Sequence, residues 1–483
     1  MRPAVVAKIL SLLCAIVSLF MGFPALYCLA DGSSDLFPLL AGMGTGLGVS
    51  ALLFAAGFKA KAGDLGVREA FAVVSLSWVL ASAIGGIPYL LYGTVPTYTE
   101  AFFEAMSGFT TTGATVLTDI QSNPRGILFW RDLTQWLGGM GIIVLSLAVL
   151  PFLKVGGMQL YKAEVPSPMP EKITPRVHQT ALLLWGVYLL LSLLQASALL
   201  LGGMNLFEAL THTFGTMATG GFSPLNRSIG QYGNAYFEWV ITLFMFLAGT
   251  NFALHFLALR GDLGAWWRNE EFRFYVKLLA LSVLVAAAFL FSSGTYGSFS
   301  DSIRYGAFQV VSIVTTTGFV TADFGLWPNF LQFLLLLLMF AGGCAGSTVG
   351  GIKSMRIMVL GKHVKTELQR LLHPKAIFTV RVGGKVLERE VISSVTAFFV
   401  MYIGLFALAA LVMAALGLDV LSAIASAAAA IGNIGPALGS VGPSSNYAHV
   451  PAAGKWVLSF CMLLGRLEIY TVMMLFLPGT WKR

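Results

Sequence analysis

Four short segments rich in threonine and glycine recur along the chain, and their residue types suit the binding of a cation. They read TTTGAT at 110–115, ATGGFS at 218–223, TTTGFV at 315–320 and IGNIGP at 431–436. Threonine hydroxyls and backbone carbonyls are neutral oxygen ligands, and glycine permits the backbone angles that turn carbonyls toward a common axis. Rings of such oxygens replace the hydration shell of a monovalent cation, whereas carboxylate rings favour divalent ions. The segments therefore predict a filter for an alkali cation, with potassium ahead of sodium.

One glycine of each segment aligns with the others, and the residue sixteen positions earlier is in every case a favoured helix N-cap. The glycines, which recur about every 100 residues, are Gly113, Gly221, Gly318 and Gly435. The predicted caps are Thr97, Asn205, Ser302 and Asp419. The apolar stretch between cap and glycine suits a half-length helix and is too short to span a membrane. Each segment therefore predicts a re-entrant loop, which is tolerated where it is enclosed by protein or lines a wet cavity.

The elements that must position these loops are membrane-spanning helices. Of the 483 residues, 57% are hydrophobic and 11% are charged, and the mean hydropathy is +0.80. The apolar runs reach about 20 residues, as a helical crossing requires, and lack the alternation of barrel strands. Ten crossings are predicted, over 5–29, 35–58, 69–92, 126–151, 179–201, 235–259, 274–293, 327–360, 390–416 and 454–478.

The predicted fold is therefore an all-α integral membrane protein with fourfold pseudo-symmetry. Each repeat consists of a helix, a re-entrant pore loop and a second helix, as in potassium channels. The first run of apolar residues is interpreted as an uncleaved helix and not as a signal peptide. The predicted units are two N-terminal helices at 1–66 and pore repeats at 67–165, 166–268, 269–372 and 373–483, the third of which contains a glycine-rich interrupted helix.

The distribution of basic residues predicts the orientation. With the N-terminus inside, most of the 30 Lys and Arg residues fall on the inner side, including the long polar stretch from Lys353 to Arg389. Both termini are therefore predicted to be cytoplasmic. The net charge of +8 is thus a sign of topology, and nucleic-acid binding is not needed to explain it. The stretch from Lys353 to Arg389 reflects either this topology together with contact with the anionic lipid bilayer, or the binding of a partner.

The eighth crossing contains AGGCAGSTVGG at 341–351, where five glycines would be costly inside a helix. Two interpretations remain open at this point. The small residues either allow close helix packing or unwind below the filter and obstruct the path. The glycines concerned are Gly342, Gly343, Gly346, Gly350 and Gly351.

Arg466 lies in the middle of the last predicted crossing. Burying a cation there costs about 2.5 to 3.5 kcal/mol on insertion scales, so the side chain is expected to face water or a partner. Glu468, two residues away, is expected to point to another helix face, which disfavours a local ion pair. Projection into the cavity beneath the filter and a distant structural ion pair both remain possible.

Other functional classes have weaker support in the sequence. The cysteines and histidines are scattered, and no clustered nucleophile, base or metal set indicates an enzyme. A secondary transporter with a midplane site for an organic solute is the main alternative, but it predicts an inverted or twofold repeat and charged groups. Glu100, Glu104 and Glu208, predicted near the outer mouth, could attract cations.

Taken together, the segments resemble the TrkH type of bacterial potassium-uptake subunit, within the Trk/Ktr/HKT cation transporter superfamily. The resemblance covers nearly the whole chain. It includes the four threonine–glycine segments, GGCAGSTVGGIKSMR at 342–356 and LLGRLEI at 463–469. In that family one glycine per loop stands where potassium channels have the first glycine of their filter. A serine in the first loop, associated with sodium preference in some relatives, is absent here.

The resemblance implies potassium uptake with K⁺ as the transported ion and with no organic cofactor bound to this chain. The implied ion ligands are Thr111, Thr112 and Gly113; Thr219, Gly220 and Gly221; Thr316, Thr317 and Gly318; and Asn433, Ile434 and Gly435. It also implies that the glycine-rich segment and Arg466 form a gate. The implied setting is the bacterial inner membrane, as a homodimer on a cytosolic ring of TrkA-type subunits that bind NAD or ATP. The fourth loop departs from the threonine pattern, which predicts only approximate fourfold symmetry.

Overall fold

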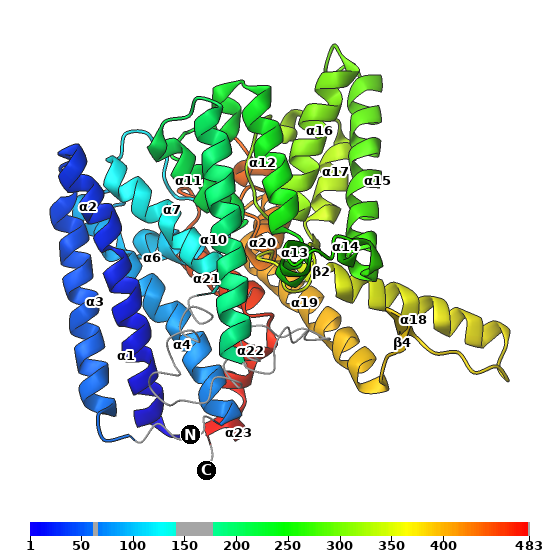
Figure 1. Cartoon of the computed structure of the whole chain (residues 1–483), viewed down its shortest axis with the longest axis horizontal. Helices are drawn as coiled ribbons and strands as arrows, with labels where there is room; N and C mark the ends of the chain where they lie inside the picture. The colour runs from blue at the N-terminus through cyan, green and yellow to red at the C-terminus, as the bar shows by residue number, and fades with distance from the viewer. Residues whose placement is uncertain (61–65, 142–176, 482–483) are drawn as a thin grey trace.

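The structure is a computed structural model that describes residues 1–60, 66–141 and 177–481. Nearly all regular elements in this part are helices, as predicted (Figure 1). Within the described residues, six helices are long and apolar enough to cross a membrane, or eight if two bent pairs each count as one span. These correspond to eight of the ten predicted crossings. Of the crossing predicted at 126–151, only the first part is described, and the crossing predicted at 327–360 is interrupted.

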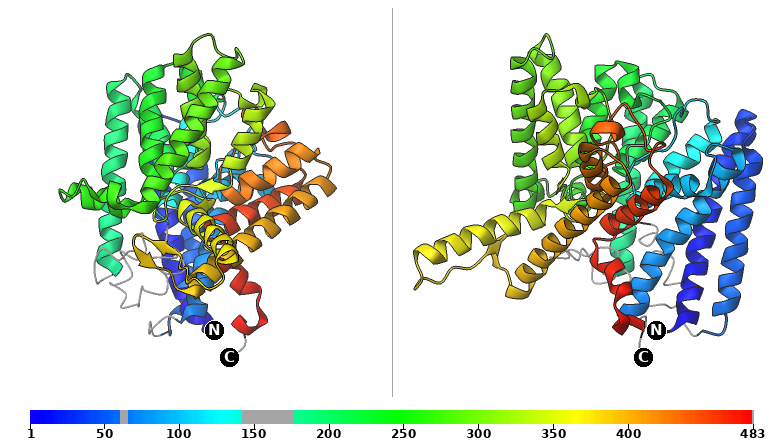
Figure 2. Two further views of the ribbon diagram at one scale, coloured as in Figure 1. Left: turned by 90° about the vertical axis from the view of Figure 1, so that its right-hand side faces the viewer. Right: turned by 180° about the vertical axis from the view of Figure 1, so that it is seen from behind.

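Three helices precede the pore repeats. They are α1 (Pro3–Phe20), α2 (Gly22–Asp31) and α3 (Leu36–Gly57), and α1 with α2 forms a single span. Helix α1 packs against α3 and against α4 of the first repeat, so this pair of spans stands at one edge of the molecule (Figures 1 and 2). Large apolar side chains such as Leu52 on α3 are exposed, as expected for a surface that faces lipid.

The same order of elements then repeats four times. The first repeat has α4 (Val67–Gly85), α5 (Ile87–Tyr92), α6 (Tyr98–Phe109) and α7 (Arg125–Gly139). The second has α10 (Val177–Leu201), α11 (Leu206–Met217), η2 (Ser228–Tyr232), α12 (Ala235–Ala248), α13 (Phe252–Leu259) and α14 (Ala265–Arg268). The half-helices α6 and α11 are the predicted pore helices.

The third and fourth repeats contain four two-residue strands besides helices. The third has α15 (Glu270–Ser292), α16 (Phe299–Val314), η3 (Phe324–Leu326), α17 (Asn329–Leu338), β1 (Ala341–Gly342), β2 (Ile352–Lys353) and α18 (Ser354–Leu372). The fourth has β3 (Arg381–Val382), β4 (Lys385–Val386), α19 (Arg389–Ala415), α20 (Val420–Gly432), η4 (Gly439–Val441), α21 (Ala452–Arg466), α22 (Tyr470–Met473), η5 (Met474–Phe476) and α23 (Pro478–Trp481). Strands β1 and β2 pair in parallel, and β3 and β4 pair as an antiparallel hairpin. The predicted fold class is confirmed. The repeat boundaries stay a prediction, and the one at 165/166 lies outside the described residues.

Three of the four predicted N-caps are confirmed. Thr97 accepts a hydrogen bond from the backbone N of Glu100 at 3.4 Å, and Asn205 and Asp419 cap α11 and α20 in the same way. The prediction of Ser302 is wrong. Helix α16 begins four residues earlier, because Ser298 accepts from the backbone N of Asp301 and donates to its carboxylate.

The positions of the two termini and of α18 define the two ends of the molecule. The start of α1 and the C-terminal helix α23 lie at the same end (Figure 1). Helix α18 and the start of α19 project beyond the bundle on the side away from α1 and α3 (Figures 1 and 2). Below, "inner" means the end that holds the start of α1 and helix α23, and "outer" means the opposite end. This usage follows the orientation predicted from the basic residues.

Candidate functional site

The four loops have the same unusual backbone conformation. In each loop the residue two positions before the aligned glycine has a left-handed φ, which is 54° for Thr111, 54° for Thr219, 52° for Thr316 and 55° for Asn433. The aligned glycines have φ values of 81°, 74°, 78° and 90°. Threonine rarely adopts this region, so its recurrence marks backbone strain held by the surrounding structure. The fourth loop thus departs from the others in side chains but not in backbone.

The four glycines also close the loops into a ring. A Cβ added to Gly113 would lie 2.1 Å from the carbonyl oxygen of Gly220 in the second loop. One added to Gly221 would lie 1.9 Å from the Thr317 oxygen, and one on Gly318 would lie 2.0 Å from the Ile434 oxygen. One on Gly435 would lie 2.6 Å from the Thr112 oxygen of the first loop. Each glycine therefore packs against the carbonyl of the next loop, in one direction round the centre, and only glycine fits.

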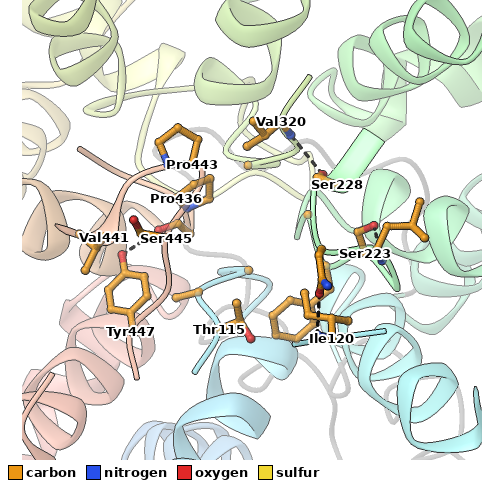
Figure 3. A pocket seen from close by; sticks show the side chains of 18 of the residues that line it. Thr115, Ile120, Ser223, Ser228, Val320, Pro436, Val441, Pro443, Ser445 and Tyr447 are labelled. Carbon is orange, nitrogen blue, oxygen red and sulfur yellow. Dashed lines mark hydrogen bonds between the residues drawn. The ribbon is translucent and has the colours of Figure 1, made fainter. Parts of the chain in front are cut away.

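On the outer side of this ring lies a cavity of about 80 Å³ that all four loops line (Figure 3). Its lining includes the four aligned glycines together with Thr115, Ser223, Val320 and Pro436. None of its lining residues is Asp or Glu. The environment is therefore one of neutral oxygens, with Arg131 as its one cationic lining residue.

The threonine hydroxyls are used differently at different positions. The Thr112 and Thr317 hydroxyls lie 2.8 Å from those of Thr110 and Thr315, at the ends of their pore helices. Asn433 Nδ2 also donates to the Thr112 hydroxyl at 3.0 Å. By contrast, the carbonyl oxygens of Thr112, Thr317 and Ile434 accept no hydrogen bond from any described residue. These three carbonyls are the better candidates for cation ligands in the second position of their loops. In the second loop, the Gly220 carbonyl at this position accepts from Gln135 Nε2 at 2.7 Å.

The glycine-rich segment lies against the inner side of the ring. The chain leaves α17, forms β1, loops through residues 343–351 and then forms β2 parallel to β1, so the crossing is interrupted at the predicted glycines. The Thr348 hydroxyl donates to the carbonyls of Met217 and Ala248 at 3.1 and 3.3 Å. The backbone N of Gly350 donates to the Thr316 hydroxyl at 2.9 Å. The segment thus contacts the inner ends of two of the four loops directly.

Arg466 joins this segment to the first loop. Its Nη1 donates to the Thr111 hydroxyl at 3.2 Å and to the Thr348 carbonyl at 2.7 Å. Its Nη2 donates to the carbonyls of Gly138 and Gly139 at 2.5 and 2.6 Å. The guanidinium therefore lies on the inner side of the ring of four loops, next to the interrupted helix.

The last crossing is not the continuous helix that the sequence predicted. Helix α21 ends at Arg466, and the chain resumes in α22 after a bend of 112°. Glu468 and Ile469 have φ values of 53° and 60° at this break. After this break, Glu468 pairs with Arg356 of α18, and its carboxylate lies 3.6 Å from Lys353 Nζ of β2.

Two sequence interpretations of acidic residues need correction. Glu104 does not face the outer mouth, because it is fully buried and pairs with Arg131 at 2.7 Å. Glu100 pairs with Lys455 at 2.7 Å and so is not a free attractant either. Sequence reasoning did not find these pairs, since their members come from different helices. The one available signal was an acidic residue inside an apolar pore helix.

In this helical membrane protein, four re-entrant loops close one ring. This arrangement is characteristic of potassium-channel-like cation transport proteins. The family model of TrkH, described as "Cation transport protein", matches residues 47–481. The chain is 41% identical over 483 residues to the Trk system potassium uptake protein TrkH of Escherichia coli strain K12, covering 99% of each. It is 40% identical over 488 residues to TrkH of Halomonas elongata, covering 100% of each.

A solved structure agrees with these sequence comparisons. The crystal structure of the potassium transporter TrkH from Vibrio parahaemolyticus superposes with a TM-score of 0.89 at 38% identity, covering 100% of each chain. The protein belongs to the TrkH family of cation transport proteins. The resemblance inferred from the sequence is thereby confirmed.

Proposed function

We propose that this protein takes up potassium through a filter formed by its four loops. The observation that carries the proposal is the ring in which each aligned glycine packs against the carbonyl of the next loop. Relatives covering the whole chain are named as potassium uptake proteins, and the cavity lining has no carboxylate. Neutral oxygen rings suit a weakly hydrated monovalent ion.

In this proposal the ligands come from three positions of each loop. The second-position carbonyls and the aligned glycines form the outer rings, and the hydroxyls of Thr111, Thr219 and Thr316 face the inner end. In the fourth loop, Asn433 takes the place of the threonine and holds the same backbone conformation. K⁺ is the transported ion, and no organic cofactor or enzymatic activity is assigned to the chain.

The inner face of the filter carries the gate. Gly342, Gly343, Gly346, Gly350 and Gly351 allow the interrupted helix to turn below the ring, and Arg466 holds Thr348 against Thr111. In this proposal the conformation is closed, because the glycine-rich segment and the Arg466 guanidinium both lie at the inner end of the ion path. Opening requires the contacts of Thr348, Gly350 and Arg466 to break.

Two adjacent glutamates connect this gate to the inner surface. The carboxylate of Glu271 accepts from the backbone N of Ala345 at 2.7 Å and of Met355 at 3.0 Å. Glu270 pairs with Lys362 and accepts from the backbone N of Gly383 at 2.8 Å. Movement of α18 and the β3–β4 hairpin would therefore be transmitted to the glycine-rich segment.

Regulation is proposed to act through this connection. The protein would work as a homodimer in the bacterial inner membrane, with both termini cytoplasmic and with a ring of TrkA-type subunits that bind NAD or ATP. The supports are the naming of the relatives as parts of a Trk system and the basic inner stretch that carries α18.

The proposal is tested by flux through the purified protein alone in proteoliposomes. Potassium and rubidium should equilibrate across the membrane at rates above those of protein-free vesicles. Saturable uptake of an organic solute without alkali-ion flux would reject the filter and favour a secondary transporter.

Shortening the glycine-rich segment separates obstruction from packing. Removal of residues 347–349 should leave the fold intact and raise basal rubidium flux several-fold, because it deletes the hydrogen bonds of Thr348 to the second repeat. Flux and thermal unfolding are measured on the same preparation. A lower melting temperature with no gain in flux would show that the segment serves only as a packing surface.

A further inference from the structure

One buried ion pair stands directly behind the filter, and the proposed conduction does not use it. Arg131 Nε on α7 donates to Glu104 Oε1 on the pore helix α6 at 2.7 Å, and the two side chains are 2% and 0% exposed. Burying two charges is costly unless hydrogen bonds satisfy both groups. The other contacts of this pair therefore indicate what it holds.

Glu104 holds the outgoing strand of the first loop, by which we mean the residues that follow the aligned glycine of a loop. Its Oε1 accepts from the Thr115 hydroxyl at 2.8 Å, and its Oε2 accepts from the backbone N of Val116 at 2.9 Å. Both partners follow Gly113 within three residues. The carboxylate thus fixes the strand that carries the ring glycine relative to the pore helix.

Arg131 extends this fastening to the second loop. Its Nη1 donates to the Ser223 carbonyl at 3.1 Å, and its guanidinium lies 3.5 Å from the centre of the Phe222 ring. Thr115 and Ser223 come from these two loops and line the same cavity (Figure 3). The pair therefore joins the outer ends of the two loops whose Gly113 and Gly220 are in contact.

The other loops show how this position is normally used. The residue nine positions before the aligned glycine is Glu104, His212, Gln309 or Ser426 in the four loops. His212 Nε2 lies 3.2 Å from the Ser223 hydroxyl, and Gln309 Nε2 donates to the Thr321 hydroxyl at 3.2 Å. In these loops the residue at this position contacts the outgoing strand of its own loop, without a charged partner among the described residues.

The fourth loop uses a different device. Ser426 donates within its own helix, to the Ala423 carbonyl, and the Tyr447 hydroxyl instead donates to the Gly435 carbonyl at 2.8 Å. The backbone N of Tyr447 also donates to the Thr115 carbonyl at 2.8 Å. Thr115 is thus held from both sides, by Tyr447 and by Glu104. The first loop is therefore the one that receives hydrogen bonds from both of these residues.

We propose that Glu104 and Arg131 are positioning residues that set the ion specificity of the filter by fixing the spacing of the first and second loops. This inference rests on the proposed conduction through the four loops. The pair touches no ion in this scheme. It acts through the strands at 113–116 and 220–223, whose carbonyls belong to two adjacent quarters of the ring.

The test replaces both charges at once, as Glu104→Met with Arg131→Met. Replacing a whole buried ion pair with apolar groups is often neutral for stability. Here the fully buried Asp132 also lies 3.8 Å from Arg131 Nη1 and loses this cationic neighbour. We therefore expect a melting temperature below that of the wild type, retained rubidium flux, and a ratio of potassium to sodium flux that falls about tenfold. The matched control is Glu100→Met with Lys455→Met. That ion pair holds the same pore helix, but neither member bonds to the strands at 113–116 or 220–223.

The outcomes are distinguishable. An unchanged flux ratio in the folded double variant, or an equal fall in the control, overturns the inference. Absence of alkali-ion flux in the wild type instead rejects the proposed function. If the double variant does not fold, Arg131→Lys retains the charge but lacks the planar fork that bonds Glu104 and Ser223 together. We expect this variant to fold with a reduced ratio, and an unchanged ratio would again overturn the inference.

Discussion

Replacing Gly113 with serine should give a folded protein that has lost most of its discrimination between potassium and sodium. The added Cβ would lie 2.1 Å from the Gly220 carbonyl oxygen, and the residue would have to keep a φ of 81°. Because the neighbour in contact is backbone, the second loop must shift, and the carbonyl at that quarter of the ring moves with it. A change of about 1.4 kcal/mol in relative ion binding corresponds to a tenfold loss of selectivity.

The measurement is the ratio of potassium to sodium flux in proteoliposomes, and Gly93 supplies a matched control. Gly93 has a similar φ of 83°, but nothing lies within 4 Å of an added Cβ. Gly93→Ser therefore imposes comparable backbone strain without the collision. Its flux ratio should equal that of the wild type. A folded Gly113→Ser protein with an unchanged ratio would remove Gly113 from the filter.

Replacing Arg466 with alanine should raise cation flux by about tenfold or more, since a unit charge a few ångströms from a permeating ion opposes it by several kcal/mol. The substitution also removes the hydrogen bonds that hold Thr348 against Thr111. Both effects act in the same direction. Rubidium flux at low driving force is the readout.

Arg466→Lys is the informative comparison. Lysine keeps the charge but cannot bond four separated oxygens as the guanidinium does. If electrostatic repulsion dominates, flux in this variant stays near the wild-type value. If the hydrogen bonds that hold Thr348 against Thr111 dominate, flux rises as it does with alanine. Loss of stability without any gain of flux in either variant would make Arg466 a structural anchor.

The sequence predicted the features that depend on local chemistry. The four glycines and three of the four caps were found because turn and cap residues recur at fixed offsets from each other. Ser302 was assigned wrongly because a fixed offset assumes pore helices of equal length, and Ser298 with Asp301 starts α16 earlier.

Features that depend on tertiary contacts could not be predicted in the same way. Thr111 has a left-handed backbone conformation, which threonine rarely adopts. This conformation depends on contacts with the neighbouring loops, so the local sequence does not predict it. The break after Arg466 has no glycine or proline at its bend, so its apolar pattern resembles a continuous crossing. Arg131 and Glu104 meet across two helices, and no spacing rule joins them.

The most direct test of the central claim is to locate the ion. Crystals grown in rubidium or thallium salts should show anomalous density on the axis of the ring formed by Gly113, Gly221, Gly318 and Gly435. Sodium should not displace this density at equal concentration. Cation density found only away from the ring, in well-ordered crystals of the active protein, would contradict the account.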